Sequence, residues 1–372
     1  MNPSLVPRSR IAHLWFRVKG SASRRHILEV TRSMWLTPTI RVNHHIHKRF
    51  LWTTAVRYNH NPLGIPQSSP TLPPRARGGL PEKRPIPHVS RVIAVSSAKG
   101  GVGKSTIAAN LALTFQIALS TPSRPARVGL LDLDVFGPSV PKLLGLEHAG
   151  QPYLSTDKKI LPLQSQGIYA MSMGFLLQSA SREGPEQADV AVVWRGAMVQ
   201  KAVQQLLFDV DWRTDDEQRL DLLVIDMPPG TGDVQLTLGQ LVKVDGAVIV
   251  STPQDLALAD TRKGIAMFRK VDVPILGMLL NYAYFTCPSC KEKHYIFGSS
   301  DSFYKAASDL NVPVLGELPI APGVSRGSDE GRQVCGPDWN DEDDSTGAER
   351  TIRRIMGNVG DEIWERLSRL PS

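Results

Sequence analysis

From residue 91 onward, short apolar runs alternate with stretches of helical periodicity. The strand-like runs lie at residues 92–95, 128–133, 222–226, 247–251, 274–280 and 312–315. Helical patterns cover 105–118, 198–210 and 256–270, and apolar residues at helical spacing predict a final helix over 348–370, packed on the sheet. Short buried strands alternating with helices are typical of a doubly wound α/β fold with a mainly parallel sheet. We therefore expect one such domain over 89–372, with an acidic, exposed loop at 328–347.

The first part of the chain has a different composition. Residues 1–81 contain thirteen Lys or Arg and a single acid, Glu29, so the net charge of +7 arises there and not in the predicted domain. Apolar side chains at 11, 14, 15 and 18 share one helical face, and basic side chains lie around the other side. This pattern is typical of a mitochondrial transit peptide. The alternatives are a basic arm that binds nucleic acid or anionic lipid and a disordered tail with no targeting role.

We accordingly predict a disordered transit peptide at 1–60, a Pro/Gly/Ser-rich linker at 61–88 and a mitochondrial matrix protein with no nucleic-acid partner. No apolar run approaches the roughly 18 residues of a membrane-spanning helix, so we expect no transmembrane segment. Three cysteines are too few for a disulfide framework in a chain of 372 residues.

A glycine cluster between the first predicted strand and the first predicted helix carries the strongest chemical signal. It reads Ser97-Ala98-Lys99-Gly100-Gly101-Val102-Gly103-Lys104-Ser105-Thr106. Glycines there let backbone N–H groups turn toward a phosphate at a helix N-terminus. Lys104 is expected to neutralise β- and γ-phosphate charge, and the Ser105 hydroxyl to ligate Mg²⁺. We therefore predict that residues 98–106 bind ATP, although Ala98 replaces the first glycine of the usual P-loop pattern.

Carboxylates follow two other predicted strands. Asp132 and Asp134 end the second strand, and Asp226 ends the strand at 222–226. In an open parallel sheet the carboxyl ends of the strands meet at the ligand crevice. We expect Asp226 to hold Mg²⁺ and Asp134 to orient a hydrolytic water. A strand-ending aspartate that merely caps the next helix is the structural alternative.

The extra lysine, Lys99, resembles the deviant Walker motif of a group of dimeric ATPases that includes nitrogenase iron protein, arsenite-pump and division-site ATPases. That resemblance implies a homodimer that sandwiches ATP, in which Lys99 reaches the nucleotide of the partner. Lys99 thus joins Lys104 and Asp134, whose roles are given above, as the expected catalytic residues. We expect slow hydrolysis, because no arginine finger is evident in the sequence. Asn281 is expected to read adenine, as the asparagine of that group implies; a structural asparagine in a turn is the alternative.

Further segments resemble one family more narrowly, the Mrp-type iron–sulfur carrier ATPases. They are Asp132-Leu133-Asp134-Val135-Phe136-Gly137-Pro138-Ser139, Asp226-Met227-Pro228-Pro229-Gly230-Thr231-Gly232-Asp233, Thr252-Pro253-Gln254 with Asp260, Lys263 and Gly264, and Trp194-Arg195-Gly196. Ala197 stands where the family usually has proline. Within the family, the mitochondrial branch that assists respiratory complex I assembly is the nearest match, because of the long N-terminal segment.

Cys287 and Cys290 form a C-x2-C pair after the strand at 274–280. Two thiolates cannot complete a tetrahedral metal site or a [4Fe–4S] cluster. The resemblance implies a [4Fe–4S] cluster bridged by these cysteines from two subunits. Zinc bound with His294 and a ligand from elsewhere, and a redox dithiol, are the alternatives. Cys335 lies far off in the predicted acidic loop.

These expectations add up to an ATP-binding protein that delivers a [4Fe–4S] cluster to mitochondrial apoproteins, with complex I subunits as the expected recipients. Two rivals use the same fold: a positioning or partitioning ATPase that acts on membrane or DNA, and an electron-transfer ATPase similar to nitrogenase iron protein. The cysteine pair discriminates against the first rival, which requires no metal.

Overall fold

The computed structural model describes residues 82–135, 137–177, 196–213, 217–340 and 347–370. Contacts divide the chain into two units, Met1–Leu72 and Pro73–Ser372, and every described residue belongs to the second unit. The predicted transit peptide, most of the linker, and Trp194 and Arg195 lie outside the described residues. Within the described ranges, no helix is both long and apolar enough to cross a membrane.

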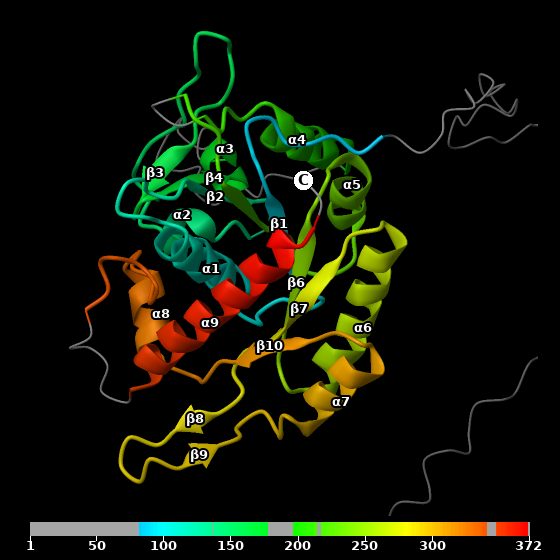
Figure 1. Ribbon diagram of the computed structural model, residues 1–372, viewed down its shortest axis with the longest axis vertical. Coiled ribbons are helices and arrows are strands. Elements are labelled where there is room, and N and C mark those ends of the chain that lie inside the picture. The colour runs from blue at the N-terminus through cyan, green and yellow to red at the C-terminus, as the bar shows by residue number, and fades with distance from the viewer. Residues whose placement is uncertain (1–81, 136, 178–195, 214–216, 341–346, 371–372) are drawn as a thin grey trace, which may run out of the picture. The chain divides into compact units, whose positions relative to one another are not determined.

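An eight-stranded sheet forms the centre of the second unit (Figure 1). Its strands in chain order are β1 (Val92–Ser96), β2 (Val128–Asp132), β3 (Leu163–Ser165), β4 (Ile168–Ser172), β5 (Leu222–Asp226), β6 (Gly246–Ser251), β7 (Ile275–Leu280) and β10 (Val314–Glu317). Their spatial order is β10-β7-β6-β1-β5-β2-β4-β3, and all neighbours are parallel except β3 and β4. The predicted α/β fold with a mainly parallel sheet is confirmed.

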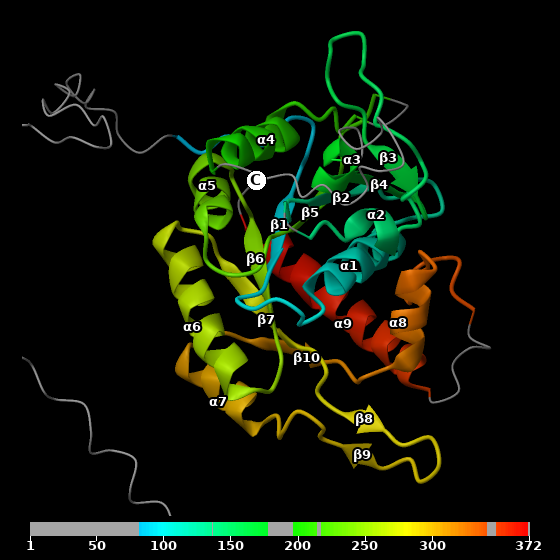
Figure 2. The same cartoon turned by 180° about the vertical axis from the view of Figure 1, so that it is seen from behind.

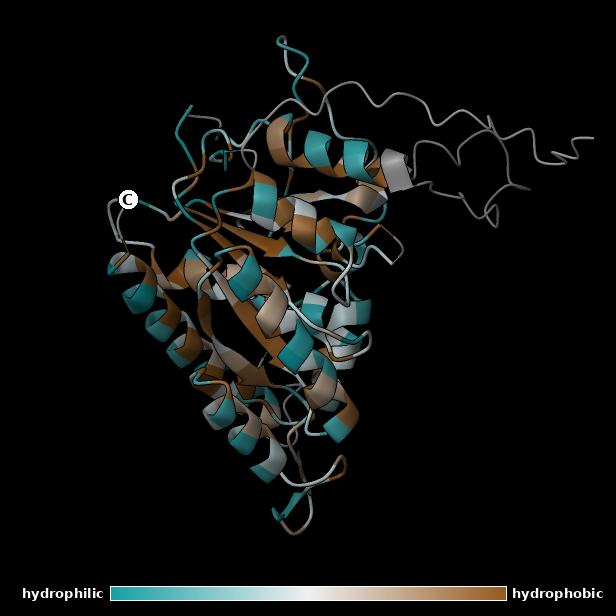
Figure 3. Cartoon of the chain, turned by 90° about the vertical axis from the view of Figure 1, so that its right-hand side faces the viewer, coloured by the Kyte–Doolittle hydropathy of each residue, from teal (hydrophilic) through white to brown (hydrophobic). Residues whose placement is uncertain are grey.

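Helices lie on both sides of the apolar strands (Figure 3). α1 (Lys104–Ala118) packs on β1, β2 and β5 and against α9 (Ala348–Ser368), which in turn packs on β10. α6 (Asp255–Lys270) packs on β6 and β7 and against α7 (Asp301–Asp309). The remaining helices are α2 (Val140–Leu143), α3 (Met173–Leu177), α4 (Gly196–Phe208), α5 (Asp233–Leu241) and α8 (Pro322–Asp329). Every residue of β1, β2, β5 and β6 is buried, as a sheet covered on both faces requires.

The sheet register fixes where the candidate site lies. β5 stands between β1 and β2, with Val95 and Asp132 both aligned with Asp226. The carboxyl ends of these three strands are therefore neighbours, and the glycine cluster begins directly after β1. Residues from three distant parts of the sequence meet at this edge, where ligands bind in open α/β sheets.

Besides a short hairpin described below, two parts of the fold differ from the sequence prediction. The edge strand β3 and its neighbour β4 were not predicted; they join through a turn in which Gln166 and Gly167 both have positive φ. The predicted exposed loop at 328–347 is wrong over its first part. Asp329 ends α8, and Gln333 and Cys335 are buried.

A buried polar network explains that difference. The Asn110 amide of α1 donates to the Gln333 side chain at 3.0 Å and accepts from the Cys335 backbone N–H at 2.9 Å. Gln333 in turn donates to the Leu143 carbonyl at 2.7 Å. Because buried polar groups must be hydrogen-bonded, this network anchors the segment to the core despite its polar composition. Residues 341–346 of the predicted loop lie outside the described ranges.

Candidate nucleotide site and cysteine hairpin

The glycine cluster forms a phosphate-sized loop at the N-terminus of α1. Gly101 and Gly103 have φ of +78° and +81°, in the left-handed region that favours glycine. A Cβ on Gly103 would also lie 2.3 Å from Nδ2 of Asn281, so no side chain fits there. The loop shape thus requires glycine at position 103, and the loop ends at the N-terminus of α1, the kind of place where anions bind.

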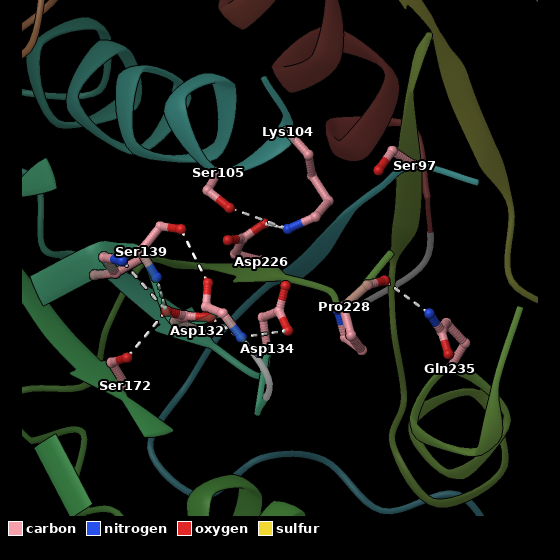
Figure 4. A network of polar contacts seen from close by, with 12 residues as sticks. Ser97, Lys104, Ser105, Asp132, Asp134, Ser139, Ser172, Asp226, Pro228 and Gln235 are labelled. Atoms are coloured by element: carbon pink, nitrogen blue, oxygen red, sulfur yellow. Dashed lines mark hydrogen bonds and ion pairs between the residues drawn. The ribbon is translucent and has the colours of Figure 1, made fainter. Parts of the chain in front are cut away.

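Lys104 and Asp226 form a buried ion pair in the floor of the site (Figure 4). The Lys104 ammonium donates to Oδ1 of Asp226 and lies 3.1 Å from the Ser105 hydroxyl. Oδ2 of Asp226 is buried without a hydrogen-bond partner among the described residues. Burial raises the pKa of Asp226, while the charge of Lys104 opposes that rise. An acceptor oxygen that lacks a partner beside a serine hydroxyl is suited to a hydrated Mg²⁺.

Asp132 has a structural role that the sequence did not separate from those of the other carboxylates. Its Oδ2 accepts hydrogen bonds from the Ser172 hydroxyl at 2.9 Å and from the backbone N–H of Ser139 at 3.1 Å, and its Oδ1 accepts from the N–H of Asp134 at 2.9 Å. Burial, together with the negative charge of Asp226, raises the pKa of Asp132 to about 7. This carboxylate holds the loop after β2 in place and accepts from N–H groups at the start of α2. Asp132 therefore caps the next helix, as the structural alternative in the sequence analysis proposed.

A cavity of about 530 Å³ brings together most of the predicted nucleotide-binding residues. Its lining includes Lys99, Gly100, Gly101, Gly103, Lys104, Ser105, Thr106 and Asp134. Within the described ranges, no hydrogen bond or ion pair engages the Lys99 ammonium. Asp134 accepts from the Gly137 N–H at 3.3 Å and is partly exposed to the cavity. The cavity therefore brings a glycine-rich backbone and the ammonium groups of Lys99, Lys104 and Lys142 together, as a polyphosphate requires, and its lining also holds the carboxylates of Asp134, Glu147 and Asp329.

Three residues of this cavity region escaped the sequence analysis. Lys142 and Asp329 line the cavity and form an ion pair at 2.7 Å that joins α2 to α8. Gln235 is buried and donates to the Pro228 carbonyl at 2.7 Å, which fixes the loop after β5. Charge and polarity alone do not distinguish these side chains from ordinary surface residues, so no sequence signal identified them.

A second cavity of about 330 Å³ adjoins the first, and the two share Thr106, Ser328 and Asp329 in their linings. Asn281 lines this second cavity, and its amide donates to the Val102 carbonyl at 2.8 Å. The asparagine thus ties the end of β7 to the P-loop. The cavity beside it has mostly apolar walls, including Ile320, Ile352 and Met356, which suit a flat base.

Cys287 and Cys290 lie in a different place, on a hairpin that extends past the ends of β7 and β10 (Figures 1 and 2). Its strands are β8 (Phe285–Thr286) and β9 (Lys293–His294). Cys290 is exposed and Cys287 partly so. Backbone N–H groups of Cys290 and Ser289 donate to the Cys287 sulfur, which lowers its pKa. Such donors stabilise a thiolate and tune metal-bound sulfur.

Cys335 is separate from this pair. It is buried against α1, and burial raises its pKa to about 11. A buried thiol with a raised pKa is a poor ligand and a poor nucleophile. His294, by contrast, lies close to both hairpin cysteines: one ligand atom from each of the three residues falls within 4.8 Å of the others.

Comparison with known proteins identifies the family to which the chain is similar. A family model described as NUBPL iron-transfer P-loop NTPase, of the ParA type, matches residues 88–359. The chain is 49% identical over 256 residues to the iron-sulfur cluster transfer protein NUBPL of Mus musculus. The matched region covers 69% of this chain and 74% of that protein. It is 43% identical over 257 residues to an Arabidopsis thaliana mitochondrial iron-sulfur protein required for NADH dehydrogenase, covering 69% and 75% of the two chains.

A solved structure of a nucleotide-binding protein from Archaeoglobus fulgidus in complex with ADP is also similar. It is 37% identical with a TM-score of 0.54, and the match covers 68% of this chain and 91% of that chain. Since the family model spans most of the sequence, and the fold and the glycine loop agree with it, this chain belongs to the family of NUBPL iron-transfer P-loop NTPases.

Proposed function

We propose that this chain is an ATP-binding carrier that holds a [4Fe–4S] cluster and delivers it to mitochondrial apoproteins, including subunits of respiratory complex I. Family membership and the names of the mouse and Arabidopsis relatives support the transfer role and its link to NADH dehydrogenase. The exposed Cys287–Cys290 pair is the observation that carries the proposal, because it presents two thiols at the surface with hydrogen-bond donors on one sulfur.

The nucleotide half of the proposal uses the two cavities. Phosphates bind the loop at 98–106, the base enters the cavity beside Asn281, and Asp134 orients water for slow hydrolysis. Ser105 and Asp226 hold Mg²⁺, whose charge neutralises the phosphates. Nucleotide binding draws the Lys104 ammonium away from Asp226 and toward the phosphates, which leaves the Asp226 carboxylate to the hydrated ion.

The cluster half needs a second copy of the chain. Each copy supplies two thiolates, and a [4Fe–4S] cluster takes four. A homodimer that faces its two hairpins toward each other completes the ligand set. The same dimer gives Lys99 a partner, the nucleotide of the facing subunit. Nucleotide can change the cluster site only if ATP binds two conformations of this dimer with different affinities.

Anaerobic reconstitution with iron and sulfide tests the cluster site. The full chain is expected to gain the visible sulfide-to-iron absorption band, and a Cys287→Ser, Cys290→Ser double variant is expected to lose it. Cys335→Ala is the matched control, since this buried thiol lies outside the hairpin and its loss leaves the band intact. A band of undiminished intensity in the double variant would overturn the assignment of the ligands.

The location is part of the proposal. Residues 1–60 are Arg-rich and almost free of acids, and we infer that they direct the chain into the matrix. A chain that lacks residues 1–60, tagged with a fluorescent protein, is expected to stay in the cytosol while the full chain enters mitochondria. Normal mitochondrial uptake of the shortened chain would contradict this part.

A further inference from the structure

The β8–β9 hairpin of one chain holds three metal-binding groups. The cysteine sulfurs and an imidazole nitrogen of His294 lie within 4.8 Å of one another. Thiolate sulfur and imidazole nitrogen are the ligands of tetrahedral zinc sites, and they select borderline-soft divalent ions over Mg²⁺ or Ca²⁺. The shared cluster proposed above uses the two cysteines and leaves His294 without a role.

Strand register explains why His294 reaches the cysteines. Phe285 is aligned with His294, and the Cys287 N–H donates to the Glu292 carbonyl at 3.0 Å. Side chains two residues apart on a strand share a face, so Cys287 and His294 are diagonal neighbours on the same face of the hairpin. The turn brings Cys290 back to that face. In this turn Lys291 has φ +63°, and its backbone N–H donates to the Cys287 carbonyl at 2.9 Å.

Aromatic contacts at the base of the hairpin hold this arrangement within a single chain. The rings of Tyr284 and Tyr295 lie 6.3 Å apart, and those of Tyr282 and Phe297 lie 6.2 Å apart. The Lys293 ammonium lies 4.1 Å from the centre of the Tyr284 ring. Such pairs stabilise a geometry beyond the area that they bury. The three ligands are therefore brought together without help from a second subunit.

We propose that each single subunit binds one zinc-like divalent ion through Cys287, Cys290 and His294, with the fourth position open. This inference rests on the proposed function for the role of the two cysteines as ligands. Its consequence is a competition: an ion held on one hairpin occupies the thiolates that the shared cluster requires. An open fourth position makes such an ion exchangeable, unlike a structural zinc with four protein ligands.

Titration of the full, metal-free chain with Co²⁺ tests the site, because Co²⁺ takes the place of zinc and reports its ligands by colour. We expect one ion per chain, a thiolate-to-cobalt charge-transfer band and the visible bands of tetrahedral geometry. Native mass spectrometry is expected to show a complex of a single chain with a single ion. The charge-transfer band excludes contributions from His44, His45 and His47, which carry no sulfur. Added Zn²⁺ is expected to remove the bands and to lower the yield of subsequent iron–sulfur reconstitution.

Three variants decide the role of His294. His294→Ala is expected to weaken Co²⁺ binding at least about tenfold, the loss that even an outer-shell change commonly causes. His294→Cys is expected to retain binding, with a stronger charge-transfer band from a third thiolate. His148→Ala, which removes an exposed histidine far along the chain, is the matched control and keeps the wild-type affinity.

The outcomes separate this inference from the proposed function. If His294→Ala binds Co²⁺ as tightly as the wild type while the wild type still reconstitutes a cluster, the inference fails and the carrier role stands. A cobalt ion that requires two chains would also overturn it. If the wild type binds Co²⁺ as described and takes up no cluster, the carrier role fails and the mononuclear site stands.

Discussion

At the scale of single residues, three aspartates with similar sequence settings have different environments. Asp132 is enclosed by four hydrogen-bond donors, Asp226 pairs with a buried lysine, and Asp134 faces the cavity. The sequence predicted that these carboxylates gather at one edge of the sheet, and this is confirmed. It gave no separate role to Asp132, because the burial and partners of this carboxylate depend on contacts with residues such as Ser172, which is distant in sequence.

Asp132 gives a prediction about pH. Its pKa rises from the usual 3.8 to about 7 in the folded protein, so the unfolded chain loses this proton at lower pH than the native chain. The contribution of Asp132 to stability therefore falls as pH rises from about 4 to about 7, by up to about 1.4 kcal/mol per unit, and is constant above that range.

Urea unfolding of the wild type and of Asp132→Asn at pH 5, 6, 7 and 8 measures this effect. The free energy of unfolding of the wild type relative to the variant is expected to decrease up to pH 7 and then level off. If the difference in free energy of unfolding between the two proteins is the same at every pH, it arises from the lost hydrogen bonds alone. That result would contradict the raised pKa of Asp132.

At the scale of elements, hydrophobic periodicity located the inner strands and the long helices. Buried runs such as 222–226 are uniformly apolar up to the terminal aspartate, and the observed β5 has the same bounds. Periodicity did not reveal β4, whose five residues include Tyr169 and Ser172 and so form no uniformly apolar run, or the β8–β9 hairpin, whose strands have two residues each. Nor did it reveal the anchoring of residues 333–335, which depends on Asn110 of a distant helix.

The packing of α9 on α1 gives a prediction at this scale. A Cβ on Gly360 would lie 2.9 Å from Cγ2 of Thr114, whereas a Cβ on Gly357 would meet no atom of the described residues within 4 Å. Gly357→Ala is expected to raise the free energy of unfolding by about 0.5–1 kcal/mol through helix propensity. Gly360→Ala has the same gain in propensity but forces α9 away from α1.

Thermal or denaturant unfolding of the two variants checks this pair, and each serves as the control for the other. Gly360→Ala is expected to be less stable than Gly357→Ala by about 1 kcal/mol or more, the usual scale of overpacking. Equal stabilisation by both substitutions would mean that α9 does not press against Thr114 in solution.

At the scale of the whole molecule, the proposed carrier is completed only by a second copy. One chain offers a nucleotide cavity with a lysine, Lys99, whose ammonium has no partner among the described residues, and a hairpin with two cysteines. The sequence anticipated both features, since a P-loop and a C-x2-C pair are local patterns. How the two copies face each other depends on surfaces far apart in the sequence, which a local pattern does not encode.

Native mass spectrometry of the anaerobically reconstituted chain measures this claim most directly, because it reports chains, iron and sulfide in one species. The account predicts that the cluster travels only with a dimer, as four irons and four sulfides per two chains. Monomeric chains that each retain a full set of four irons and four sulfides would contradict it.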